Sequence, residues 1–424
     1  MKVAGIIAEY NPFHKGHAYH IRRTRELTGA DYIITVISGD YVQRGMPALM
    51  DKYLRCEMAL SQGADLVLEL PVAYATASAE SFAMGAVSLL DKLGITDFIC
   101  FGSECGDLEK LSYLAGHLKE ESPAFSEAIQ NELKAGHPYP LARQRAIEVC
   151  RQIPGALSQL EEMTCDEIQS LLNEPNNILA LEYLKSLQRR HSTMKPLTIK
   201  RESSGYHDTS TDTELVSATA IRSLYQTGEL SRLADTVPSS VLEILEREYN
   251  RRFPIFADDF SMCLYYRLLM EKERNASLYY YQDVSKELGL RIYNELPSYK
   301  GYEAFCMHVK TRQYTLTRIN RSLLHILLNI KGKDYQFYSM HDFIPYIRVL
   351  GFREASSTLL SAIKKNCSVP LITKMADADK RLNTCGRKML SQEVFASDLY
   401  RKMQENKFHI SLPNEYTERI RIID

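Results

Sequence analysis

The chain has 424 residues, which is too long for one ordinary domain and predicts two or three domains. Its 52 basic and 53 acidic residues give a formal net charge of -1, so any nucleic-acid surface must be a local patch. No segment reaches the roughly 18 apolar residues of a membrane helix, and the nine cysteines include no CxxC pair. We therefore expect a cytoplasmic protein with reduced thiols, without a membrane-spanning segment and without a zinc site.

The first hundred residues alternate short apolar runs with helical patterns, as βαβ units on a parallel sheet do. Continuous β-branched and aliphatic runs predict strands that are buried on both faces. These runs are KVAGIIA at 2–8, YIITVIS at 32–38, DLVLELP at 65–71 and DFICFGS at 97–103. Helices are expected between them at 52–62 and 78–93.

The pattern then becomes mostly helical at about 106–194, before the strand-like run KPLTIKR at 195–201 and the polar loop ESSGYHDTSTD at 202–212. Strands almost vanish beyond 231, where segments such as FSMCLYYRLLMEK and NRSLLHILLNI show helical spacing of apolar residues. The prediction is α/β: a Rossmann-like parallel-sheet domain at 1–230 with a helical insertion at about 106–194. A separate, mainly helical region is expected at 231–424.

Two histidines follow the first predicted strand in the sequence HKGH, and the second of them, His17, opens the next helix. Open α/β sheets bind ligands at the carboxyl ends of their strands. Gly16 lets the backbone approach a ligand, and the free N–H groups of a helix start favour phosphate. His14 and His17 would donate hydrogen bonds as charge builds up on a phosphate. A lone HxGH often arises by chance, but its place after a strand favours catalysis, whereas His20 is expected to be an ordinary helix residue.

A second motif, VSATAIRSL at 216–224, follows the polar loop. Ser217 or Thr219 would cap a helix there, and Arg222 on its first turns would face a β- or γ-phosphate and stabilise departing pyrophosphate. The plain alternative is a capped helix with a solvated arginine. Together with HKGH, this motif resembles the signature of the HxGH nucleotidyltransferase superfamily, whose members transfer a nucleotide from ATP or CTP.

A wider set of segments resembles one family, the bacterial tRNA(Met) cytidine acetate ligases. They are GIIAEYNPFHKGHAYH, SGDYVQRGMPA, GADLVLELP, FGSE, PNNILALEYL, SATAIR and KTRQYTLTRINR. The resemblance implies an enzyme that activates acetate with ATP as acetyl-adenylate and then acetylates N4 of the wobble cytidine. Its partners would be acetate and elongator tRNA(Met), with no membrane and no DNA.

The resemblance also implies an ATP site. It falls on Ile7, Ala8, Glu9, Tyr10, Asn11, Pro12, Phe13, His14, Lys15, Gly16, His17, Ala18, Tyr19 and His20, on Gly102, on Asn176 or Asn177, and on Arg201. A glycine after a strand lets a base or ribose lie on the backbone, and an asparagine after Pro175 would read adenine, hold a phosphate or simply cap a helix. Mg²⁺ would accompany ATP. Asp40 and Arg44 are candidates for binding Mg²⁺ or the acyl group, although a polar turn explains them nearly as well.

Between Glu303 and Asp334 the chain has no acidic residue, which suits contacts with RNA phosphates. The predicted tRNA-binding residues are Lys310, Arg312, Tyr314, Arg318 and Arg321, and Lys331 and Lys333 add further charge. The tyrosine would stack on an unpaired base. The plain alternative is a solvated helical face.

Two other functions are compatible with the sequence. An adenylyltransferase acting on a small phosphometabolite would not need the basic helical region. A non-catalytic RNA-binding protein with the same fold would show no acetate-dependent ATP turnover.

Overall fold

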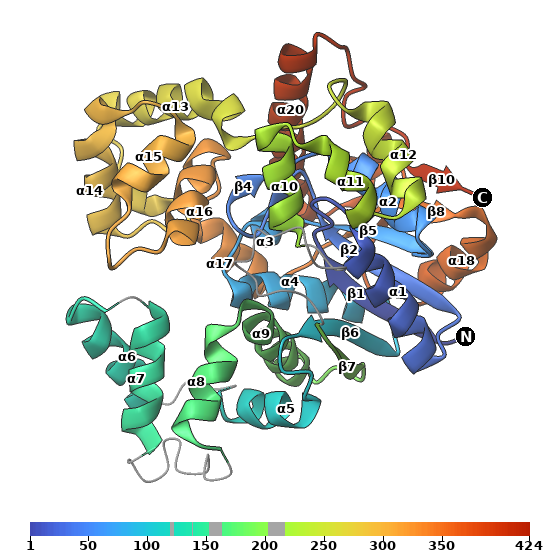
Figure 1. Ribbon diagram of the computed structural model, residues 1–424, viewed down its shortest axis with the longest axis horizontal. Helices are drawn as coiled ribbons and strands as arrows, with labels where there is room; N and C mark the ends of the chain where they lie inside the picture. Colours follow the sequence, from blue (N-terminus) through green and yellow to red (C-terminus); the bar gives the residue numbers. More distant parts are fainter. Residues whose placement is uncertain (119–122, 138, 152–162, 202–216) are drawn as a thin grey trace.

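A sheet of eight strands forms the centre of the protein in a computed structural model that describes residues 1–118, 123–137, 139–151, 163–201 and 217–424 (Figure 1). The strand order is β10-β8-β5-β2-β1-β6-β7, and β9 pairs with β8. The strands are β1 (Val3–Ala8), β2 (Tyr32–Ser38), β5 (Leu66–Leu70), β6 (Phe98–Ser103), β7 (Lys195–Lys200), β8 (Ile347–Arg353), β9 (Leu371–Ile372) and β10 (Arg421–Ile423). The predicted α/β fold is confirmed.

The five predicted strands form one parallel block, β5-β2-β1-β6-β7, with β1 in its middle. The register pairs Ile7 of β1 with Val36 of β2, and Gly102 of β6 with Ile199 of β7. Parallel strands end at the same edge of a sheet. Segments that follow β1, β6 and β7 therefore meet at one edge, which is where ligands bind in such folds.

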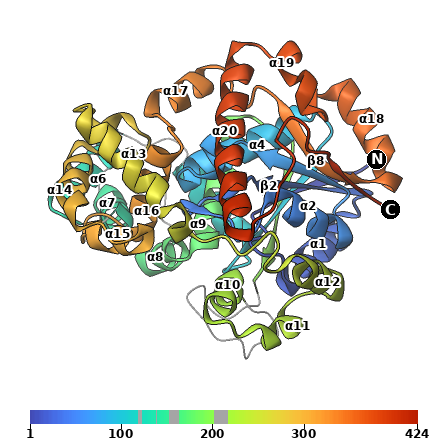
Figure 2. The same ribbon diagram turned by 90° about the horizontal axis from the view of Figure 1, so that it is seen from above.

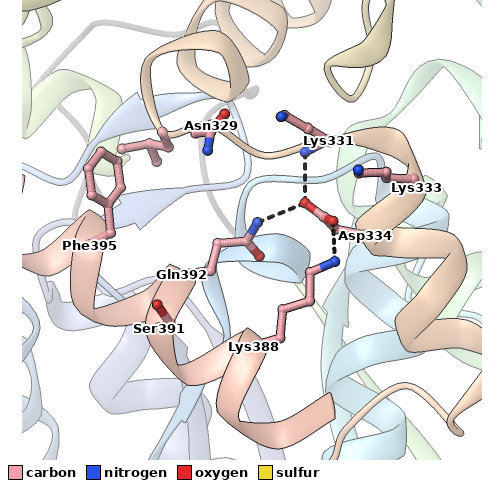
Figure 3. Close-up of a pocket in the computed structure, with 9 residues that line it drawn as sticks. Asn329, Lys331, Lys333, Asp334, Lys388, Ser391, Gln392 and Phe395 are labelled. Carbon is pink, nitrogen blue, oxygen red and sulfur yellow. Dashed lines mark hydrogen bonds and ion pairs between the residues drawn. The ribbon is translucent and has the colours of Figure 1, made fainter. Parts of the chain in front are cut away.

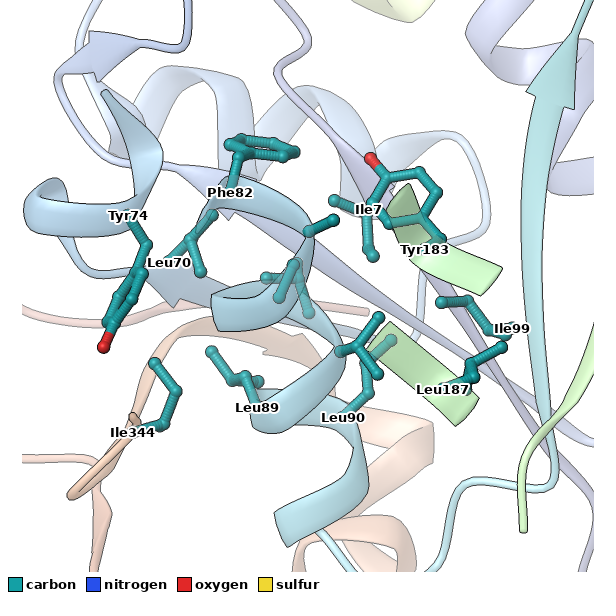
Figure 4. Close-up of a cluster of buried hydrophobic side chains, with 14 of the residues drawn as sticks. Ile7, Leu70, Tyr74, Phe82, Leu89, Leu90, Ile99, Tyr183, Leu187 and Ile344 are labelled. Carbon is teal, nitrogen blue, oxygen red and sulfur yellow. The ribbon is translucent and has the colours of Figure 1, made fainter. Parts of the chain in front are cut away.

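Helices cover both faces of the sheet because the strand side chains alternate between two apolar clusters. One face carries α1 (Lys15–Thr28), α2 (Lys52–Ser61), α10 (Ala218–Thr227), α11 (Leu233–Thr236) and α12 (Ser239–Glu248). The other carries α3 (Val72–Ala75), α4 (Ala79–Lys92), α5 (Leu108–His117) and α9 (Pro175–Arg189). Figure 4 shows Leu90 of α4 and Leu187 of α9 packed around Ile99 of β6. Close approach is required at Gly5, where a Cβ atom would lie 2.7 Å from Leu90 Cδ1.

The predicted helical insertion between β6 and β7 is present and also contains α6 (Pro123–Lys134), α7 (Tyr139–Arg151) and α8 (Cys165–Asn173). Local sequence fixes its helix starts. Thr164 and Glu167 form a capping box at α8, and Pro175 occupies the first turn of α9, where its missing N–H costs no hydrogen bond. The polar loop at 202–212 lies outside the described residues.

A helical module with its own apolar core lies beside the sheet and comprises α13 (Ser261–Glu273), α14 (Lys286–Glu295), α15 (Tyr302–Val309) and α16 (Leu316–Leu327). Figure 2 shows α20 (Thr384–Phe408) between this module and the sheet. Tyr400 of α20 joins the core of the module, whereas Leu390 joins the core under the sheet. None of the described helices combines the length and apolar character that a membrane crossing requires.

The region 231–424 is mainly helical, as expected, but it is not separate from the sheet, because the chain returns to the sheet after α17 (Gly332–Met340). Strand β8 pairs antiparallel with β5, Leu68 facing Val349, and β10 pairs with β8. Between them lie α18 (Ser357–Asn366) and α19 (Ala378–Arg381). β8 covers an edge of β5 whose unpaired backbone groups would otherwise be exposed.

A buried charge cluster ties this returning segment to the N-terminal half. The Lys52 ammonium lies 2.7 Å from Glu69 Oε1 and 2.5 Å from Glu415 Oε1. Arg348 of β8 bridges the same two carboxylates, at 2.8 Å from Glu69 and 2.5 Å from Glu415. All four side chains are buried. The cluster satisfies charges that could not be buried singly.

Replacing Lys52 with alanine should lower the free energy of unfolding by about 3–5 kcal/mol, because two buried carboxylates lose one of their two cationic partners. Urea denaturation followed by circular dichroism measures this change. Lys364→Ala on the exposed face of α18 is the matched control and should stay within about 0.5 kcal/mol of the original chain. Equal midpoints for the two variants would contradict the role assigned to the cluster.

Candidate active site

The segment 9–17 after β1, called here the histidine loop, is held in place by its own buried residues. Tyr10 and Phe13 are buried in the core beneath the loop. The Asn11 side-chain oxygen accepts a hydrogen bond of 2.8 Å from the Leu49 N–H. Arg222 of α10 donates to the Asn11 carbonyl at 2.7 Å. Tyr10, Asn11 and Phe13, which belong to the predicted ATP segment, therefore hold the loop in position.

The two histidines of HKGH stack on each other, with ring centroids 3.7 Å apart. The His14 backbone N–H donates to His17 Nδ1 at 3.2 Å, so a neutral His17 carries its proton on Nε2. His14 Nδ1 is buried and has no hydrogen-bond partner among the described residues. A Cβ atom on Gly16 would lie only 2.9 Å from His14 Cε1, so glycine makes room for the ring. The pair can donate hydrogen bonds to an incoming ligand.

Burial keeps the imidazoles uncharged. It lowers the pKa of His14 to about 3, with Arg201 and Arg222 adding to the effect, and lowers the pKa of His17 well below its ordinary value. His20 shares this environment: burial and Arg201 lower its pKa to about 4, and its Nε2 has no hydrogen-bond partner among the described residues. His20 therefore belongs to the same cluster and is not an ordinary helix residue.

The SATAIR motif lies against the histidine loop. Ser217 caps α10 by accepting from the Ala220 N–H at 3.2 Å, and Arg222 donates to Thr219 Oγ1 at 2.9 Å. Burial lowers the pKa of Arg222 to about 10, while Glu9 opposes the shift, so the guanidinium stays charged at neutral pH. The fold thus brings a cation from residue 222 to the loop at residue 14.

Arg201 follows β7 and extends the sheet edge, its N–H donating to the Ser103 carbonyl at 2.9 Å. A Cβ atom on Gly102 would lie 3.3 Å from Arg201 Cγ, so the glycine lets the arginine side chain lie across the end of β6. The position fits the role predicted for both residues.

The two asparagines at the start of α9 differ in their partners. Asn177 is buried, and its side-chain oxygen accepts from the N–H groups of Glu104 and Cys105 at 3.0 and 3.2 Å. Asn176 donates from Nδ2 to Glu104 Oε1 at 2.6 Å. The Asn177 side chain thus ties α9 to the segment after β6 and does not cap a helix, and Asn176 is the better candidate for ligand contact. The carboxylate of Glu104, in the FGSE segment, has no predicted role and accepts hydrogen bonds from the backbone N–H groups of both asparagines.

Asp40 does not face the histidine loop. It accepts from the Lys52 N–H at 2.9 Å, and its carboxylate lies 3.8 Å from Lys52 Nζ in the buried charge cluster, where burial raises its pKa to about 6. The prediction that Asp40 binds Mg²⁺ or the acyl group is wrong, because its carboxylate oxygens contact the Lys52 N–H and lie near the Lys52 ammonium. Arg44, from the turn between β3 (Tyr41–Val42) and β4 (Met46–Pro47), remains close enough to Glu9 for the two charges to interact.

The predicted tRNA-binding residues differ in how far they are exposed on the helical module. Lys310 and Arg312 are exposed, and Arg318 is half-buried with its guanidinium 5.2 Å from the Tyr314 ring centroid. Tyr314 itself is only 6% exposed and shares a hydrogen bond of 2.8 Å with Ser285, so it cannot stack on a base.

Arg321 also departs from its predicted role. Its Nε lies 2.7 Å from Asp283 Oδ2, which neutralises the charge locally. The prediction that Tyr314 and Arg321 bind tRNA is therefore wrong, because both side chains form contacts within the helical module.

No group of three histidine, cysteine or acidic side chains placed to hold a metal ion occurs in the part of the chain that the structure describes.

Comparison with known proteins identifies the family of the chain. A family model described as HIGH Nucleotidyl Transferase matches residues 1–413. The tRNA(Met) cytidine acetate ligase of Acetivibrio thermocellus is 39% identical over 433 residues and is covered, like this chain, to 100%. The chain belongs to the tRNA(Met) cytidine acetate ligase family. The ligase of a Thermoanaerobacter species is 41% identical, with 96% of both chains covered.

Two solved structures resemble this member of the ligase family along its whole length. The crystal structure of Thermotoga maritima TmcAL bound with alpha-thio ATP has a TM-score of 0.90, with 31% identity and 100% of both chains covered. The apo form of the same protein has a TM-score of 0.91 at the same identity and coverage. The resemblance stated on the sequence motifs is thereby confirmed.

In the nucleotide-free ligase, the His14 imidazole should stay neutral from pH 8 to below pH 5, because burial disfavours its charged form. Nitrogen-15 NMR titration measures this directly, with His14→Gln used to assign the signal. Arg201→Gln should raise the pKa of His14 only partly, since burial is the larger cause.

The same shift predicts the pH dependence of folding. Unfolded histidines take up protons near their ordinary pKa of about 6.5, which the folded ones exclude, so stability should fall as the pH drops below that value. An NMR transition of His14 near pH 6.5 in the original chain would contradict both expectations.

Proposed function

We propose that this chain activates acetate with ATP and transfers the acetyl group to N4 of the wobble cytidine of elongator tRNA(Met). The observation that carries the proposal is the stacked, neutral pair His14 and His17 at the carboxyl end of β1, with Arg201 and Arg222 beside it. Full-length similarity to proteins named tRNA(Met) cytidine acetate ligase supports the substrate assignment. ATP and tRNA both point to the cytoplasm as the place of reaction.

In the first step, an acetate oxygen attacks the α-phosphorus of ATP, and the bond from that phosphorus to the bridging oxygen of the β-phosphate breaks. The products are acetyl-adenylate and pyrophosphate. Negative charge grows on the phosphate oxygens during attack, and the Nε2–H of a neutral His17 can stabilise it by hydrogen bonding without giving up its proton. Arg222 stabilises the departing pyrophosphate by charge.

In the second step, the N4 amine of the cytidine attacks the acetyl carbonyl carbon. The bond between that carbon and the phosphate oxygen breaks, AMP leaves with the electron pair, and the amine loses one proton. The intermediate is an activated acyl group that water would also attack. Enclosure of the intermediate against the buried side chain of His14 would shield it from water until the tRNA arrives.

For the nucleotide itself, we assign the contacts to the rim of the same sheet edge. The backbone of residues 7–20 and Gly102 would border the base and ribose, and Asn176 would supply a side-chain oxygen. Arg201, Ser217 and Thr219 would border the phosphates, with Mg²⁺ accompanying them. Arg44, which lies close enough to Glu9 for their charges to interact, would supply a further cation for acetate or phosphate.

His14→Ala and His17→Ala should each lower acetyl-adenylate formation by about 10²-fold or more, with a smaller loss of ATP affinity, because the imidazoles stabilise the transition state more than bound ATP. Incubation with ATP, radiolabelled acetate and unfractionated tRNA, followed by identification of the labelled nucleoside, measures the whole reaction. His341→Ala, at the exposed end of α17, is the control and should retain full activity. Undiminished turnover in both loop variants would refute the catalytic assignment, and absence of labelled N4-acetylcytidine with the original chain would refute the proposed function.

A double variant, Lys310→Ala with Arg312→Ala, should weaken tRNA binding and lower the steepness of its salt dependence by up to about 2, because each lost phosphate contact removes one released counterion. Acetyl-adenylate formation should be unchanged. Fluorescence anisotropy of labelled tRNA at several salt concentrations measures binding. The exposed pair Lys364 and Lys365 of α18, changed to alanine together, controls for net charge. Identical salt slopes in the two double variants would place the RNA surface elsewhere.

A further inference from the structure

A hollow of about 410 Å³ lies between the start of α17 and one face of α20, away from the histidine loop (Figure 3). It lies within the size range of small-ligand pockets, about 300–1,000 Å³. Lys331, Lys333 and Asn329 border it from the α16–α17 side, and Lys388, Gln392 and Phe395 border it from α20. The α20 residues recur at helical spacing, so they present one face to the hollow.

The floor of the hollow is rigid. Asp334 is buried, and its carboxylate lies 2.5 Å from Lys388 Nζ and 3.3 Å from both Gln392 Nε2 and the Lys331 backbone nitrogen. The Gln392 oxygen in turn accepts from the Tyr338 hydroxyl at 3.1 Å. The amide of Gln392 is thereby held in one orientation, and Lys388 is held beside it.

The hollow attracts anions. Three lysines and one aspartate line it, which leaves an excess of two positive charges. Asp334 already engages Lys388, and among the described residues no ion pair joins it to the ammonium group of Lys331 or Lys333. These two lysines end the acid-free stretch of the sequence. They are exposed or half-buried, unlike Tyr314 of the same stretch.

An exposed aromatic side chain borders the same hollow. Phe395 is 48% exposed on the rim opposite the two lysines. Exposed aromatic faces stack on unpaired bases, and a free inorganic anion would make no use of them.

We propose that this hollow binds an unpaired nucleotide of the RNA partner, with its phosphodiester at Lys331 and Lys333 and its base against Phe395. The inference rests on the proposed function, which makes tRNA the acetyl acceptor. It adds a contact formed by α17 and α20, separate from the contact proposed for Lys310 and Arg312 at the α15–α16 turn. The hollow holds the RNA and leaves the chemistry to the histidine loop.

The test uses two variants that leave Lys388 in place, so that buried Asp334 keeps its cation. Lys331→Ala with Lys333→Ala should weaken tRNA binding about tenfold or more at physiological salt and lower the salt slope by about 2. Phe395→Ala should weaken binding about tenfold with little change in slope, because stacking is not screened by salt. The Lys364→Ala, Lys365→Ala double variant is again the charge-matched control.

Acetate-dependent exchange of pyrophosphate into ATP is measured in parallel and should equal that of the original chain in every variant. If the original chain fails to bind tRNA even at low salt, the proposed function itself is overturned. If the original chain binds tRNA and both hollow variants match the control, the hollow is overturned while the proposed function stands. Loss of the exchange reaction in the hollow variants would also overturn the inference, since the hollow would then serve catalysis or folding.

Discussion

The buried guanidinium of Arg55 holds together the two strand ends on which the active site depends. It donates to the carbonyl oxygens of Glu9 at 2.8 Å, Ser38 at 2.9 Å and Met50 at 3.1 Å, and also to that of Gly39. These carbonyls follow β1, follow β2 and precede α2. A planar fork of five N–H groups can satisfy several carbonyls that water cannot reach. The histidine loop leaves β1 at Glu9. The hydrogen bond from Arg55 to the Glu9 carbonyl therefore fixes the position at which the loop starts.

The turn at residues 43–45 connects the histidine loop to the helical module. Gly45, in the turn next to Arg44, approaches the backbone of α16 so closely that a Cβ atom would lie 2.3 Å from Arg321 N. Gln43, two residues earlier, donates its N–H to Glu9 Oε1 at 2.8 Å. A three-residue stretch therefore touches both the histidine loop and the helical module. The module cannot shift against the sheet without straining that turn.

The parts of this fold that sequence predicts well are those that local patterns determine. The parallel strands, the HKGH turn and the Ser217 cap each depend on residues within a few positions of one another. Tyr314, Arg321 and Asp40 were misjudged because Ser285, Asp283 and Lys52, which bury or neutralise them, lie between 12 and 38 residues away. Strand β8 escaped prediction for a related reason. Its apolar run is short and surrounded by helices, and only its partner β5, some 280 residues earlier, makes it a strand.

The arrangement of β8, β10 and Glu415 also constrains when the protein can fold. Lys52 and Arg348 need Glu415, which follows Arg348 by 67 residues, and β10 (Arg421–Ile423) lies beyond it in the chain. During synthesis these residues emerge from the ribosome after β1, β2, β5 and β8. The growing chain must therefore hold an incomplete sheet, with an open β8 edge and a buried cation short of one partner, until residues 415–423 have emerged. A chain cut before Glu415 would have the HKGH and SATAIR motifs and lack the residues that close the structure around them.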